Sequence, residues 1–178
     1  MYPQPYLDYL IQFHVERDYF ECHEILEEYW KSSPPDQRKA VWVGLIQIAV
    51  ALYHQRRGNQ NGAIKMLTSA IRLLEQHRED VQQLGLDSAA LHLLLTKRLE
   101  EISTGIAYRS LSLPIREEAL QRAYEHACAL RNAPVSRESD LNDHYLMNKH
   151  TLRDRTDVFA ERQRQFDLRE QRRKASEK

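Results

Sequence analysis

The stretch from residue 40 to residue 53, AVWVGLIQIAVALY, constrains the fold more than any other part of the chain. Its side chains are apolar on every side of a helix, and Gln47 is the only strongly polar one. A helix that is hydrophobic all round has to be buried by other elements. The stretch is too short to span a bilayer, which takes roughly 20 apolar residues. We therefore expect it to be the central helix of a helical core.

The composition favours helix along most of the chain, which at 178 residues suits one domain. Only 5 glycines and 6 prolines interrupt a sequence rich in the helix formers Ala, Leu, Glu, Gln and Arg. The breaks at these residues separate helices expected at about 6–31, 37–57, 62–83, 87–103 and 115–131, the first of them kinked near Arg17 and Asp18. We predict an all-α fold of antiparallel helical hairpins that form a small bundle, with an extra C-terminal helix.

The composition changes after residue 132. Residues 1–132 predict a helical bundle domain, whereas residues 133–178 form a charged extension with few aliphatic side chains. In the extension Tyr145, Leu152, Phe159 and Phe166 recur every seven residues, which is a narrower stripe than a coiled-coil seam. We expect residues 136–170 to dock as a helix on the body, on a second copy or on a helical protein partner. The last residues are expected to be disordered.

The net charge and the cysteine content indicate which partners and which cellular compartment to expect. The formal net charge is +0, so no field of the whole protein attracts nucleic acid or an acidic membrane, and neither partner is expected. Cys22 and Cys128 show no paired spacing, which fits a reducing cytosol better than a disulfide-stapled secreted domain. No basic region followed by an apolar run begins the chain. We expect a cytoplasmic protein.

A group of chemically active side chains lies on the helix before the central one. His23, Glu27 and Trp30 share one helix face because they are spaced four and three residues apart. A His and a Glu four apart can ligate one metal ion or hydrogen-bond to one another. His54 on the central helix is our choice for the third ligand, and this donor set suits one divalent zinc, iron or manganese ion. The polar pocket between these helices would also be lined by Phe20, Glu24, Trp30 and Gln47.

The same residues have a purely structural interpretation. His23 and Glu27 could form a buried pair that joins the two helices, with Trp30 as a large core residue. Two functions therefore stay open: a small protein whose polar pocket holds a divalent metal, and a helical interaction module in which the His/Glu cluster is structural. If the chain is an enzyme, a metal-dependent hydrolase with Glu24 or Glu27 as the base is the default.

The spacing His23-x-x-x-Glu27-x-x-Trp30, followed by Gly44-Leu45-Ile46-Gln47 and Gly58-Asn59, resembles the domain of unknown function 309 family of bacteria and archaea. The resemblance covers roughly residues 6–113. It implies a small all-helical fold, for which a role in metal binding has been suggested. It marks His23, Glu27 and Trp30 as candidate functional residues, whereas His54 as a ligand is our own inference.

A second resemblance concerns the hairpin that the central helix forms with the next one. The residues that carry it stand at the spacing of a tetratricopeptide repeat, with a His in place of the usual Tyr; they are Ala51, His54, Gly58, Ala63, Leu67 and Ala70. Flanking repeats are not evident, and one repeat cannot bury its own faces. The resemblance implies tetratricopeptide-like packing of this helix pair.

Overall fold

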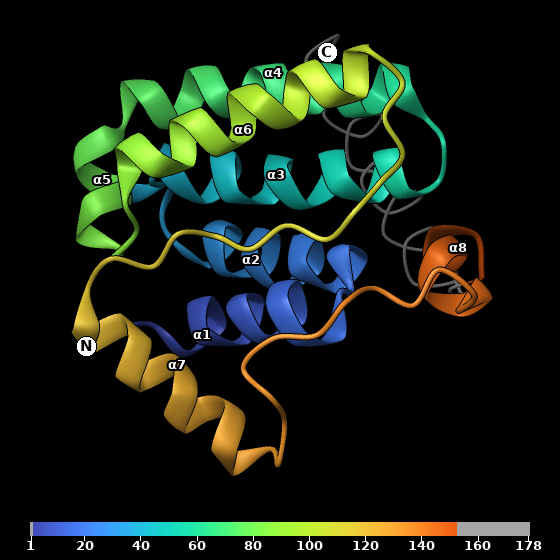
Figure 1. The fold of residues 1–178 in the computed structure, drawn as a ribbon. Helices are drawn as coiled ribbons and strands as arrows, with labels where there is room; N and C mark the ends of the chain where they lie inside the picture. Colours follow the sequence, from blue (N-terminus) through green and yellow to red (C-terminus); the bar gives the residue numbers. More distant parts are fainter. Residues whose placement is uncertain (1, 153–178) are drawn as a thin grey trace, which may run out of the picture. The chain divides into compact units, whose positions relative to one another are not determined.

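The computed structural model describes residues 2–152 of the chain. Within that range the elements are α1 (Gln4–Ile11), a π-helical turn η1 (Gln12–Glu16), α2 (Tyr19–Ser32), a 3-10 turn η2 (Pro35–Gln37), α3 (Ala40–Arg56), α4 (Gln60–Gln76), α5 (Arg78–Gln83), α6 (Ser88–Ser103), α7 (Glu118–Leu130) and α8 (His144–Leu152) (Figure 1). No strand occurs in this range, and an isolated antiparallel bridge joins Leu86 to Ile115. The predicted all-α bundle is confirmed for the described residues.

The chain divides into two compact units, residues 1–147 and residues 148–178. Of the second unit the structure describes only residues 148–152, which are the end of α8. Both cysteines, Cys22 and Cys128, are free thiols buried in the first unit. Across residues 2–152, no helix combines the length and the apolar character that crossing a membrane requires.

The central position predicted for residues 40–53 is confirmed. α3 lies between α2 on one side and α4 on the other, and α6 packs on α4 (Figure 1). α2 and α3 run antiparallel, because the Tyr29 ring lies 5.3 Å from the Trp42 ring at one end and the Phe20 ring lies 6.1 Å from the Tyr53 ring at the other. Apolar side chains on nearly every side of α3 are buried by these neighbours, as a helix without a polar face requires.

The predicted kink near Arg17 is a complete break between two helices. The π-helical turn η1 carries the chain out of α1 and ends at Arg17, whose φ of 56° is left-handed. Asp18 then starts α2, because its side chain accepts a hydrogen bond from the backbone N–H of Glu21 at 2.9 Å. This cap fixes the first turn of α2, and the next turn carries His23.

Other observed helix boundaries agree with the predicted ones where a capping residue determines them. Gly58, with φ of +74°, follows α3, and the Asn59 side chain caps α4 by accepting from the N–H of Gly62. The single helix expected over 62–83 is wrong, because the backbone leaves helical geometry at His77 and restarts as α5. The central helix has no side-chain cap: Asp36 lies in η2, and Lys39 precedes α3 without capping it.

The start of the C-terminal extension lies against the helical body. Arg56 of α3 donates hydrogen bonds to the Ser139 hydroxyl at 2.9 Å and to the Leu146 carbonyl at 3.2 Å. Residues 133–143 are not helical, and within α8 the backbone of Asn148 (φ −125°, ψ 20°) departs from helical geometry. Tyr145 and Leu152, which precede and follow that interruption, are both exposed. The expected helix over 136–170 is therefore not continuous within the described part, and residues 153–178, with Phe159 and Phe166, lie outside it.

Gly44 marks a close approach between α3 and α4. A Cβ at this position would lie 2.5 Å from Cδ2 of the buried Leu74. We expect Gly44→Ala to lower the free energy of unfolding by about 1–2 kcal/mol, because overpacking costs more than alanine gains in helix propensity. Chemical denaturation checks this against Thr68→Ala at an exposed site of α4. Equal midpoints for Gly44→Ala and the wild type would show that the displacement of Leu74 costs no more than alanine gains in helix propensity.

Candidate functional site

One helix segment gathers the donor atoms of the candidate site. His23 Nδ1 lies 3.0 Å from Glu24 Oε1, and His23 Nε2 lies 3.6 Å from Glu27 Oε2. One donor atom from each of these three residues lies within 4.8 Å of the other two. Two ligands of one metal ion, each about 2.1 Å from it, lie roughly 3.0–3.4 Å apart. His23 and Glu27 are therefore almost at coordinating separation.

The three side chains are partly open to solvent. His23, Glu24 and Glu27 are exposed by 30%, 31% and 38%, so they do not form the buried pair that the structural interpretation requires. Glu27 also has a cationic neighbour, because Lys31 Nζ lies 2.9 Å from its Oε1. Ion pairs this exposed contribute about 0–1 kcal/mol to stability. The arrangement thus adds little to the fold, and water and ions can reach it.

Of the other residues predicted to line the pocket, Phe20 lies beside this group, whereas the contacts of Trp30 and Gln47 are with other parts of the molecule or unassigned. The Phe20 ring lies 6.3 Å from the His23 ring. Trp30 is covered by the guanidinium of Arg38, whose Cζ lies 4.7 Å from the ring centroid. On α3, Gln47 is half-buried, and its buried Oε1 has no hydrogen-bond partner among the described residues.

His54 is not in the group of donor atoms that α2 brings together. Its Nδ1 lies 3.1 Å from Asn59 Nδ2, at the turn between α3 and α4. Burial lowers the pKa of His54, and the nearby positive charge of Arg57 adds to this. Phe20 of α2 packs beside Tyr53, the residue that precedes His54 on α3. Phe20 lies almost one helical turn before His23 along α2. The third donor in the observed group is Glu24, which we expected to line the pocket or to act as a base.

The chain is similar in sequence to known proteins. Residues 6–66 match the model of a family described as Domain of unknown function (DUF309). Over 169 residues the chain is 48% identical to the uncharacterized protein YpuF of Bacillus subtilis (strain 168), across 95% of this chain and 97% of that protein. The chain belongs to the DUF309 family. The segment matched to the DUF309 model includes the whole of α2, with its three donor residues, and the whole of α3. No solved structure matches the chain.

Proposed function

We propose that this DUF309 protein binds one divalent metal ion through His23, Glu24 and Glu27. The observation that supports the proposal is the convergence of three donor atoms within 4.8 Å on one face of α2. Because all three residues belong to one capped helix, their separation does not depend on the packing of distant segments. An ion pair between Glu27 and Lys31 would have to give way to the metal.

The donor chemistry fits a transition metal. One imidazole nitrogen and two carboxylate oxygens are ligands of zinc, iron and manganese in proteins. When bound, such an ion makes its coordinated water more acidic, which is the property that metal-dependent hydrolases use. The protein would supply the coordinating side chains and hold them in position. His23 would supply a neutral ring nitrogen, so binding should weaken as the solution becomes acidic.

The proposal predicts near-stoichiometric binding of Zn²⁺ or Mn²⁺ by untagged protein, measured by isothermal titration calorimetry and elemental analysis. We expect His23→Ala and Glu27→Gln each to weaken binding by about tenfold or more, as loss of a ligand does. The control is His92→Ala, since His92 Nδ1 lies 3.1 Å from Glu75 Oε2 at similar exposure, outside the candidate group.

Metal binding by these variants distinguishes the candidate site from other histidines. Equal loss of metal in the His92→Ala and His23→Ala proteins would contradict the assignment to α2. So would retention of a full equivalent of metal by the His23→Ala protein. A His54→Ala variant tests the residue that sequence spacing favoured, and its binding is expected to match that of the wild type because His54 lies outside the group.

A further inference from the structure

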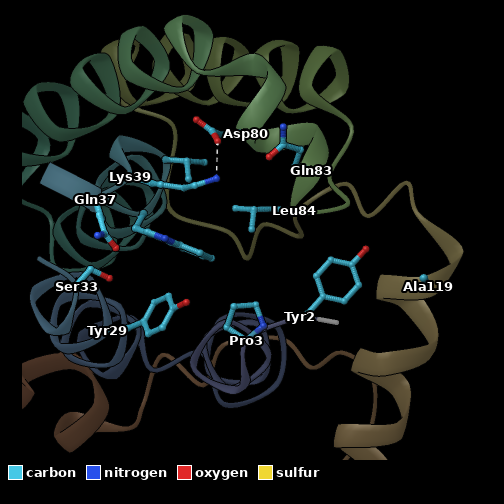
Figure 2. A pocket seen from close by; sticks show the side chains of 12 residues that line it. Tyr2, Pro3, Tyr29, Ser33, Gln37, Lys39, Asp80, Gln83, Leu84 and Ala119 are labelled. Atoms are coloured by element: carbon cyan, nitrogen blue, oxygen red, sulfur yellow. Dashed lines mark hydrogen bonds and ion pairs between the residues drawn. The ribbon is translucent and has the colours of Figure 1, made fainter.

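The molecule contains a second candidate site, independent of the proposed metal ligands. A cavity of about 490 Å³ lies where the C-terminal end of α2 meets the N-terminal ends of α1, α3 and α7 and the helix α5. Figure 2 shows Tyr29, Pro3 and Tyr2 along one side of it and Lys39, Leu84 and Asp80 along the other. Pockets that bind small molecules have volumes of about 300–1,000 Å³. The cavity is therefore large enough for a small organic ligand.

The charges that line the cavity cancel. Its charged lining residues are Lys39 and Asp80, and Lys39 Nζ lies 3.1 Å from Asp80 Oδ1. The other carboxylate oxygen of Asp80 lies 3.5 Å from Nδ1 of His77. A cavity without a net charge in its wall gives no Coulombic preference for an anion or a cation. Electrostatics therefore favours a neutral ligand here.

Aromatic rings form much of the wall, and neighbouring rings hold them in place. Trp42 is packed edge-on between Tyr29, at 5.3 Å, and Tyr6, at 5.6 Å between ring centroids. Tyr2 in turn lies 6.2 Å from Tyr6. Tyr2 and Tyr29 are only partly buried, so their rings, supported by Tyr6 and Trp42, offer surface to a planar ligand with little loss of side-chain entropy on binding.

Amide and hydroxyl groups supply the polar part of the wall. Gln37 and Gln83 each offer two N–H donors and a carbonyl acceptor, and Ser33 adds a hydroxyl group. Groups of this kind pair with the alternating donors and acceptors at the edge of a heterocycle. Both glutamine side chains are exposed, so an aliphatic ligand would leave them hydrogen-bonded to water and would gain no polar contact from them.

We propose that this cavity binds a neutral planar heteroaromatic compound of the nucleobase or nucleoside class. The base would lie against the aromatic wall and its heteroatom edge would face the two glutamine amides. The inference stands on the cavity, its cancelling charges and its fixed rings, and it holds whether or not α2 binds metal.

The test uses adenosine, guanosine, cytidine and uridine as probes, in separate titrations of the full chain. The chain has 2 tryptophans, so Trp30→Phe leaves Trp42 as the only tryptophan, and its fluorescence reports on the cavity. Saturation-transfer NMR on the unmodified protein gives a second readout. We expect at least one nucleoside to bind, to change the Trp42 emission, and to do so equally with and without a metal chelator.

Filling the cavity should abolish this binding. Ser33→Phe places a ring in the cavity, whereas Ser32→Phe at the neighbouring exposed position is the matched control. We expect at least a tenfold loss of affinity in the first and none in the second. If Ser33→Phe fails to fold by circular dichroism, Ala119→Leu fills the cavity from an exposed site on α7. Absence of binding by all four probes, or binding that survives a folded cavity-filling variant, would overturn the proposal.

Discussion

Acidification from pH 6.5 to pH 4.5 is expected to lower the free energy of unfolding by ~2.3 kcal/mol through one side chain, His14. This imidazole is only 4% exposed. Its Nε2 accepts a hydrogen bond from the backbone N–H of Leu113 at 3.0 Å, which requires the neutral ring. Burial, reinforced by the positive charge of Arg17, lowers the pKa of His14 from 6.5 to about 3.

The direction of the effect follows from the two pKa values. In the unfolded chain His14 takes up a proton as the pH falls below 6.5, whereas in the folded protein it stays neutral until about pH 3. Protonation therefore stabilises the unfolded state first, and the loss of stability steepens from about 0.7 kcal/mol per pH unit at pH 6.5 to about 1.4 kcal/mol per pH unit near pH 5. Well above pH 6.5 the ring is neutral in both states and contributes no pH dependence.

A comparison of two proteins isolates this contribution. His14→Gln keeps an acceptor for the Leu113 N–H at a similar reach but does not titrate. We expect urea denaturation to show a steeper loss of stability in the wild type than in His14→Gln between pH 6.5 and pH 4.5. Equal slopes for wild type and His14→Gln would show that His14 is not neutral in the folded protein.

Arg17→Ala is expected to lower the free energy of unfolding by about 3–5 kcal/mol. Arg17 is 2% exposed, and its guanidinium donates to backbone carbonyls of three separate segments. Nη1 donates to Phe13 at 2.9 Å and to Leu111 at 2.6 Å, and Nε donates to Arg137 at 2.6 Å. Truncation leaves these acceptors without their donor and opens a cavity among buried residues, and both effects destabilise.

Two variants test this account of Arg17. Arg17→Lys keeps the charge but cannot reproduce the planar fork, so we expect it to recover only part of the loss. Because Lys and Ala share the cost of the left-handed backbone at this position, their difference reports on the hydrogen bonds. Arg122→Ala, on the exposed face of α7, should stay within about 0.5 kcal/mol of wild type. A loss below about 1 kcal/mol in Arg17→Ala would contradict the role given to these bonds.

The parts of the fold that sequence predicted are those that local chemistry determines. The burial of α3 followed from its lack of a polar face, and the turn after it followed from Gly58 and Asn59. The end of α4 at His77 was missed because no glycine or proline stands there. The burial of His14 was not predictable from any short pattern, because it depends on the η1 turn and on a loop almost a hundred residues away.

Of the candidate site, the sequence predicted the part that lies within one helix. The spacing of His23 and Glu27 on one helix placed them together, because that separation is set by helix geometry alone. The position of His54 depends on how α2 and α3 are offset along their axes, which one sequence does not encode in any short pattern. The cavity beside Trp42 was missed for the same reason, since its wall comes from distant segments.

An anomalous difference map from zinc-loaded crystals of the untagged protein, recorded at the zinc absorption edge, tests the central claim most directly. The account predicts one strong peak within bonding distance of His23 and of Glu24 or Glu27 on α2. No peak at these residues despite saturating zinc, or a peak at another group of side chains, would contradict it.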